Sequence, residues 1–272
     1  MRKQTKMIMF LFGASLMLVL LVYMTFVEPK RVVIERVVVR DRQLADKLHG
    51  LRVVHLSDLH LKKDLGLRER LLLEKLSDLK PDLIFFSGDF VDNREAIPVM
   101  QSFARLLSAR IGVFAVAGNN DHHAIHPTDL SHLLADTPVQ ILSNTNRRLS
   151  LPNGEYIWIV GVDDPTTGHD NLSGSLPVLP QDPIIMLCHS PALFKAASAA
   201  GVRLLLTGHT HGGQVRIPGV VQIFHKVKGG GPLLGLYREQ ETFMYINRGI
   251  GTRTVPFRFL CPPEITVLEF TH

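Results

Sequence analysis

The chain has 272 residues, of which 46% are hydrophobic and 20% are charged, and its formal net charge at pH 7 is +5. This composition excludes a disordered or low-complexity chain and allows one domain with a large core. The two cysteines, Cys188 and Cys261, are too few for a disulfide-dense scaffold or a four-cysteine zinc site. Thirteen histidines stand out and call for a search for metal-ligand spacing.

Much of the positive charge lies near the N-terminus. Residues 1–30 contribute +3, which leaves only +2 for residues 31–272. A folded part so close to neutral lacks the global basic balance that drives non-specific nucleic-acid binding. We therefore expect no nucleic-acid partner, and a nuclease is the less favoured class of enzyme.

Residues 7–27 read MIMFLFGASLMLVLLVYMTFV and contain no charge. At a rise of ~1.5 Å per residue, a helix of this length spans a bilayer core of ~30 Å. The alternative is a cleaved signal peptide, whose apolar region is usually about 7–15 residues long and ends at small residues. No such site follows this segment, which favours an uncleaved anchor after a basic tail at 1–6. Positive side chains flank both ends, so the charge rule for orientation is nearly balanced.

Residues 28–49 form a charged, Val-rich connector, in which VVIERVVVR predicts either a first strand or an extended stalk. A different pattern of apolar and polar residues begins at residue 50 and continues to residue 272. Short apolar, β-branched runs alternate there with helical patterns, as in a domain whose helices cover the faces of a sheet. The predicted strands are 51–56, 82–87, 112–117, 156–162, 184–188, 203–207, 243–247 and 265–270.

Two helices are predicted between these strands. Residues 67–79 carry a leucine stripe, and residues 191–200 follow Ser190 as N-cap with Pro191 in the first turn. The second half of the chain is richer in strands than in helices, which indicates that part of the sheet is antiparallel. The fold class is therefore α/β.

Polar residues able to bind a metal follow five of the predicted strands. Ligands of an α/β sheet bind outside the carboxyl ends of its strands, where several loops converge. Carboxylate, amide and imidazole donors together suit Mn²⁺ best, with Fe²⁺ or Zn²⁺ as alternatives, whereas Ca²⁺ prefers oxygen alone. Too many candidates exist for one tetrahedral ion, and they suit two ions ~3.5–4 Å apart that share a carboxylate. The candidates are Asp58, His60, Asp89, Asn119, His189, His209 and His211.

The motifs occur in the order D-x-H, G-D-x-x-D, G-N-x-D, a lone His and G-H-x-H. This order resembles that of the calcineurin-like metallophosphoesterases over about residues 50–272. The stretches GHTHGGQVRIPG and NRGIGTRTVPFRFLCPPEITVLEF are similar to the bacterial membrane-associated subgroup, which includes phosphodiesterases and UDP-2,3-diacylglucosamine hydrolases. The resemblance implies a four-layer α/β/β/α sandwich.

The resemblance also implies a division of the ligands. Asp58, His60, Asp89 and His211 would hold one ion, and Asp89 would bridge to the other. The second ion would be held by this bridging carboxylate together with Asn119, His189 and His209. A hydroxide between the two ions would attack phosphorus in line, and Asp92 would be structural rather than a ligand.

One position departs from the family pattern G-N-H-[DE], because Asn120 replaces the histidine that assists phosphate binding and protonates the leaving group. An amide donates a hydrogen bond but is no general acid near pH 7, and general acid catalysis contributes typically 10²–10⁴-fold. We expect a leaving group of low pKa, or a substitute acid at His122 or His123.

Further residues near these motifs are open to two interpretations. Asp163 and Asp164 follow the run 156–162 and are either cleft residues or ordinary loop residues. Arg248 and Arg253 are either phosphate-binding or ordinary surface arginines.

The sequence thus predicts a phosphoesterase of the inner (plasma) membrane, anchored by a single span, that hydrolyses a phosphodiester or pyrophosphate bond. Anchoring favours a lipid-linked or nucleotide-sugar substrate such as UDP-2,3-diacylglucosamine, and such a substrate favours a cytoplasmic catalytic domain. The alternative is a metal-binding scaffold at the membrane, weakened in catalysis because Asn120 stands at the general-acid position.

Overall fold

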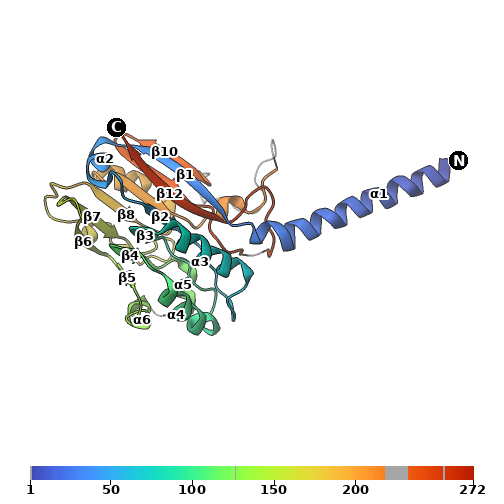
Figure 1. The fold of residues 1–272 in the computed structure, drawn as a ribbon, viewed down its shortest axis with the longest axis horizontal. Helices are drawn as coiled ribbons and strands as arrows, with labels where there is room; N and C mark the ends of the chain where they lie inside the picture. Colours follow the sequence, from blue (N-terminus) through green and yellow to red (C-terminus); the bar gives the residue numbers. More distant parts are fainter. Residues whose placement is uncertain (1, 126, 218–231, 254) are drawn as a thin grey trace.

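The computed structural model describes residues 2–125, 127–217, 232–253 and 255–272. Within these residues the strands form two six-stranded sheets (Figure 1). The first has the order β1 (Val33–Arg40), β12 (Glu264–Thr271), β2 (Val53–Leu56), β3 (Leu83–Phe86), β4 (Gly112–Ala115) and β5 (Val139–Ile141). The second has the order β10 (Gly235–Glu239), β11 (Thr242–Ile246), β9 (Leu204–Thr207), β8 (Ile184–Leu187), β7 (Tyr156–Gly161) and β6 (Thr145–Ser150).

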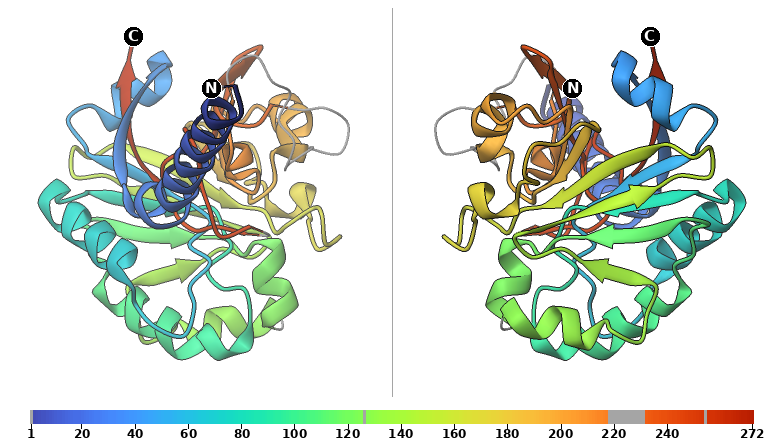
Figure 2. Two further views of the ribbon diagram at one scale, coloured as in Figure 1. Left: turned by 90° about the vertical axis from the view of Figure 1, so that its right-hand side faces the viewer. Right: turned by 90° about the vertical axis from the view of Figure 1, so that its left-hand side faces the viewer.

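Helices cover the outer faces of the two sheets, and Figure 2 shows them on opposite sides of the molecule. The first sheet is covered by α3 (Leu67–Leu79), α4 (Ile97–Leu106) and α6 (Pro127–Leu133). The second is covered by α7 (Leu172–Ser175) and α8 (Phe194–Ala199). The short helices η3 (Arg94–Ala96), η4 (Pro191–Leu193) and α5 (Asn119–Ala124) lie in the loops that follow strands, and α2 (Arg42–Leu48) follows β1.

The hydrophobic core lies in three layers. Phe85 and Phe114 of the first sheet meet Ile159 and Leu206 of the second in the space between the sheets. Separate clusters fill the space between each sheet and its helices. Burial of each such side chain is worth about 1.5–3 kcal/mol. The expected α/β/β/α arrangement is therefore confirmed.

The leucine stripe of α3 is buried along most of its length, at Leu72, Leu76 and Leu79. Leu67 differs from the expectation, because it begins the helix and is 56% exposed. The helix ends at Lys80, which has a left-handed φ of 47°. Ser190 caps the predicted helix 191–200 as expected, since its side chain accepts a hydrogen bond from the N–H of Ala192.

The Val-rich connector forms strand β1 rather than a stalk. It pairs in parallel with β12, from Val33 opposite Glu264 to Arg40 opposite Thr271. The preceding residues form α1 (Arg2–Val22), a π-helical turn η1 (Tyr23–Val27) and a 3₁₀ turn η2 (Glu28–Lys30). No residue of α1 is buried, and the helical stretch Arg2–Lys30 is long enough to cross a membrane and contains an 18-residue window with a mean hydropathy of 2.5. Figure 1 shows α1 projecting away from the sheets.

The segment after α1 enters the first sheet at the same end of the fold as the predicted site. This follows from the directions of the strands. Strand β12 is antiparallel to β2, while β2, β3 and β4 are mutually parallel. The carboxyl ends of β2, β3 and β4 therefore lie where β12 and its parallel neighbour β1 begin. The segment that leaves α1 thus joins the first sheet at the end that carries the polar loops (Figure 1).

Candidate metal centre

The loops after β2 and β3 are joined by backbone hydrogen bonds. The N–H of Asp58 donates to the carbonyl of Gly88, and the N–H of His60 donates to the carbonyl of Asp89. Asp58, His60 and Asp89 all have left-handed φ values, between 46° and 60°. In the loop after β9, His209 and His211 have φ values of 68° and 52°. Residues other than glycine adopt such backbone conformations at a cost of about 1–3 kcal/mol each. Residues with these strained conformations cluster at functional sites.

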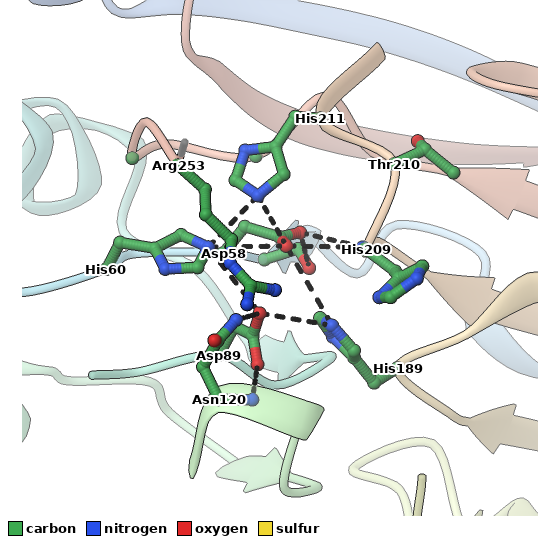
Figure 3. Close-up of polar contacts among 12 residues, drawn as sticks. Asp58, His60, Asp89, Asn120, His189, His209, Thr210, His211 and Arg253 are labelled. Atoms are coloured by element: carbon green, nitrogen blue, oxygen red, sulfur yellow. Dashed lines mark hydrogen bonds and ion pairs between the residues drawn. The ribbon is translucent and has the colours of Figure 1, made fainter. Parts of the chain in front are cut away.

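One group of donors is formed by Asp58, His60 and His211 (Figure 3). Oδ1 of Asp58 lies 3.3 Å from Nε2 of His211. Nε2 of His60 lies 3.0 Å from Nε2 of His211 and 3.8 Å from Oδ1 of Asp58. All three side chains are buried, and one ligand atom from each lies within 4.8 Å of the other two.

A second group of donors adjoins the first. Oδ2 of Asp89 lies 3.3 Å from Nε2 of His189 and 3.5 Å from Nε2 of His60. The Asn119 amide lies 3.2 Å from Nε2 of His189 and 2.9 Å from Nδ1 of His209. The carboxylate of Asp89 therefore lies between imidazoles of both groups, the place that a bridging ligand would occupy. Asp58 also borders both groups, since its Oδ1 is 4.0 Å from Nε2 of His189.

Neighbouring groups turn the imidazoles toward the centre. Nδ1 of His60 lies 2.5 Å from Oδ1 of Asp92, and Nδ1 of His189 donates to the carbonyl of Ser87 at 2.7 Å. Both hydrogen bonds place the ring proton on Nδ1 and leave Nε2 to face the site. Asp92 thus contacts a candidate ligand and orients it, as the resemblance implies for a structural residue.

The carboxylates hold the pKa values of two imidazoles high. Burial alone lowers the pKa of His60, but Asp58 and Asp92 outweigh burial and raise it to about 9. Burial likewise opposes the effect of Asp89 on His189, whose pKa rises to about 10. The same attraction depresses the pKa of Asp89 against the effect of burial. A dense set of carboxylates and imidazoles that attracts positive charge so strongly fits divalent cations, which replace protons in such sites.

Two glycines allow the loops to approach this closely. A Cβ on Gly118 would lie 2.2 Å from Oδ1 of Asp89, and a Cβ on Gly208 would lie 1.8 Å from Oγ of Ser57 and 2.2 Å from Oδ2 of Asp58. No side chain fits at either position without displacing a candidate ligand.

The three residues predicted to act in catalysis lie in different surroundings. Asn120 lies in the centre, where its Nδ2 donates to Oδ2 of Asp89 at 2.5 Å and its backbone N–H donates to Oδ1 at 2.8 Å. Nε2 of His122 lies 2.5 Å from Oδ1 of Asp163, and its ring stacks on that of His169. His123 is exposed to solvent.

The two arginines differ in their surroundings. Arg248 is paired with Glu264 and, at 2.8 Å, with Glu35, so its charge is used within the fold. Arg253 enters the site, and its Nη1 lies 3.0 Å from the Asn119 amide, to which it donates when the amide oxygen is turned toward it (Figure 3).

Arg253 borders a groove of about 370 Å³ that opens beside the donor cluster. The groove has charged, amide and apolar side chains in its lining. It is lined by Lys62, Asp92, Asn120, Thr252, Arg253, Val255 and Pro256.

Sequence reasoning gave no role to Asp121. Its carboxylate accepts hydrogen bonds from the backbone N–H groups of Gly118, Asp89, Phe90 and Val91, at 2.8–3.1 Å. This carboxylate holds the loops after β3 and β4 together. The sequence feature that indicates this role is the acidic residue at the last position of the motif G-N-x-D.

The amino-acid sequence matches a family model and several known proteins. The family model described as "Calcineurin-like phosphoesterase" matches residues 51–213. An uncharacterized metallophosphoesterase of Bacillus subtilis, YkuE, is 31% identical over 90% of this chain and 87% of its own length. The UDP-2,3-diacylglucosamine pyrophosphatase LpxG of Chlamydia muridarum is 27% identical, over 82% of this chain and 84% of its own. The phosphodiesterase YaeI of Escherichia coli is 28% identical, over 82% and 83%.

Proposed function

The chain belongs to the calcineurin-like phosphoesterase family, and we propose that it is a membrane-anchored phosphoesterase with two divalent metal ions. The observation that carries the proposal is the convergence of seven oxygen and nitrogen donors from five loops. Family membership supports a hydrolase of phosphate esters in general. The substrate, the metals and the anchor are our inference.

The donor set fits two ions. Asp58, His60 and His211 would hold one, Asn119, His189 and His209 the other, and Asp89 would lie between them. Mn²⁺ suits these mixed ligands best, with Fe²⁺ or Zn²⁺ as alternatives. When bound, such ions lower the pKa of water and neutralise charge on phosphoryl oxygens.

The chain's own residues then bind and orient the phosphate. Asn120 directs an amide N–H toward the centre and can donate to a phosphoryl oxygen, but it cannot deliver a proton. Arg253 offers a guanidinium at the mouth of the same centre, and Lys62 adds a second positive charge on the groove. This arrangement favours a substrate with two phosphates joined by an anhydride, because the leaving phosphate needs little protonation and is itself an anion that the basic groove can hold.

The apolar helix suggests where such a substrate lies. An enzyme fixed in a membrane by α1 shares one surface with a lipid-linked or nucleotide-sugar lipid substrate. The relative LpxG has the name UDP-2,3-diacylglucosamine pyrophosphatase, and this name supports the same substrate class here. Because a nucleotide-linked substrate is cytoplasmic, we place the domain on the cytoplasmic side of the plasma membrane. A fluorescent protein that folds only in the cytoplasm, fused after His272, should therefore fluoresce, whereas alkaline phosphatase fused there should be inactive.

The central test is hydrolysis by the full chain reconstituted with Mn²⁺. We expect cleavage of UDP-2,3-diacylglucosamine and of bis-(p-nitrophenyl) phosphate by the wild type. Asp89→Ala should lose both activities and most of the bound metal. Asp46→Ala is the matched control, because this carboxylate is 55% exposed and lies on α2, outside the site. Metal bound at two ions per chain without any hydrolysis would contradict the proposal.

That last outcome would favour the second candidate, a metal-stabilised scaffold at the membrane. The observation in its favour is Asn120, which places an amide where the family pattern has a general acid. The comparison of wild type with Asp89→Ala separates the two, since a scaffold gives the same absence of turnover in both.

A further inference from the structure

The site lies at the end of the domain from which α1 projects. The residue that begins β1, Val33, pairs with Glu264, and two residues further along β12, Thr266 pairs with His55 of β2. Asp58 is the third residue after His55. The chain therefore passes from the end of α1 into the fold within a few residues of the candidate metal ligands.

Two hydrogen bonds attach the segment 258–261 to the end of the apolar helix. The backbone N–H of Arg258 donates to the carbonyl of Met24 at 3.0 Å, and the N–H of Cys261 donates to Oε1 of Glu28 at 2.6 Å. The carboxylate of Glu28 is buried in this contact. The attachment fixes where this segment lies with respect to any bilayer that α1 enters.

Large apolar side chains are exposed on and beside this attachment. Phe26 and Val27 of η1 are 59% and 48% exposed, and Leu260 is 49% exposed. A parallel bridge between Val215 and Phe259 joins a second segment to the first, and Ile217, two residues beyond it, is 46% exposed. We call Phe26, Val27, Ile217 and Leu260 the membrane-side patch.

Basic side chains accompany the patch. Nζ of Lys30 lies 5.9 Å from the ring centre of Phe26, and Arg31 is exposed next to it. Arg216 adjoins Ile217. An aromatic ring and long cationic side chains beside exposed aliphatic groups are typical of a surface at the level of lipid headgroups. The segment that carries Leu260 continues from Val255 and Pro256, which line the groove beside the metal centre.

We propose that the membrane-side patch rests in the headgroup layer of the bilayer, so that the groove receives its phosphate substrate at the membrane surface. The partner is a lipid surface, and the chemistry that recognises it is apolar insertion together with attraction of anionic headgroups. The inference rests on the proposed membrane anchor. It goes further because it states which face of the catalytic domain meets the bilayer.

The test uses tryptophan fluorescence of the full chain in vesicles of phosphatidylcholine and phosphatidylglycerol, with and without lipids brominated near the headgroup. Leu260→Trp and Ile217→Trp report on the patch, and Phe12→Trp reports on α1. Leu179→Trp is the matched control. Leu179 is an exposed leucine with a φ of 49°, close to the 51° of Leu260, but it precedes β8 whereas the site residue His189 follows that strand.

The unaltered chain, with its one tryptophan at position 158, supplies the background. We expect brominated lipid to quench the added fluorescence by roughly half at positions 260 and 217 and hardly at all at 179, since only the first two would lie at headgroup depth. Quenching at 12 without more quenching at 260 and 217 than at 179 would overturn the patch and leave the anchor intact. Absence of quenching at 12 would overturn the anchor itself, and the patch with it.

Discussion

Asp92 lies directly against His60, with its Oδ1 2.5 Å from Nδ1 of the imidazole. The carboxylate thereby fixes both the ring orientation and the position of the proton, and it leaves Nε2 to face His211 and Asp89. A residue outside the candidate ligand set thus controls the direction of one ligand.

We expect Asp92→Asn to lower the affinity for Mn²⁺ by roughly 10–100-fold without unfolding the protein, because loss of the carboxylate frees the His60 ring to rotate. Isothermal titration with Mn²⁺ measures the affinity, and circular dichroism checks the fold. Asp46→Asn serves as the control. An unchanged Mn²⁺ affinity would show that His60 is held by its packing alone.

Gly118→Ala should remove metal binding. Its added methyl would lie 2.2 Å from Oδ1 of Asp89, the central carboxylate, so that either the loop after β4 or the Asp89 side chain must move. Metal content of the purified protein measures the loss.

Gly201→Ala separates this clash from a general effect of losing a glycine. No atom lies within 4 Å of a Cβ at Gly201, but its φ of 76° strains any side chain. We expect a loss of about 1 kcal/mol in the free energy of unfolding with full metal content. Full metal content in Gly118→Ala as well would mean that the loop accommodates the methyl.

The sequence was most informative where strands are buried on both sides. All eight predicted runs form strands, because each is a short run of apolar, β-branched residues bounded by turn residues. Three further strands, β5, β6 and β10, were missed. β6 (TNRRLS) and β10 (GLYRE) are edge strands with exposed polar side chains, so hydrophobic patterning does not reveal them.

The site also has features that the sequence reveals and features that only the fold reveals. The seven candidate ligands could be proposed from the sequence because each follows a strand, and the topology of the sheets brings their side chains together. Arg253 could not be distinguished from Arg248 in the sequence, since only the fold shows that Glu264 and Glu35 pair with Arg248 and that Arg253 reaches Asn119. Such differences depend on contacts between distant segments.

Arg258 is fully buried, and its guanidinium donates to the carbonyls of Arg248, Gly249, Gly251 and Cys261. We expect Arg258→Ala to lower the free energy of unfolding by about 3 kcal/mol or more, because these buried carbonyls lose their donor. Arg148→Ala should change stability by less than about 1 kcal/mol, since Arg148 is 49% exposed and forms a surface ion pair with Asp182. Chemical denaturation of both variants measures the difference. Equal losses would mean that water replaces the guanidinium.

His122 is the better candidate for a substitute general acid, because the structure pairs it with Asp163 while His123 faces solvent. Nδ1 of His122 is buried without a hydrogen-bond partner among the described residues. Burial lowers the pKa of His122, but Asp163 outweighs burial and raises it. The ring therefore keeps its proton to higher pH than an ordinary histidine.

For a diester with an alkoxide leaving group, kcat should then fall as the pH rises through the pKa of His122. Asp163→Asn removes the attraction that raises this pKa, so the fall should move to lower pH. His122→Ala should lower kcat by roughly 10²-fold with the alkoxide and far less with p-nitrophenolate, which needs no proton, whereas His123→Ala should change neither. The pH profiles of kcat for both substrates measure these effects. If Asn120→His instead raises turnover of the alkoxide substrate strongly while His122→Ala changes nothing, the chain has no substitute acid and depends on leaving groups of low pKa.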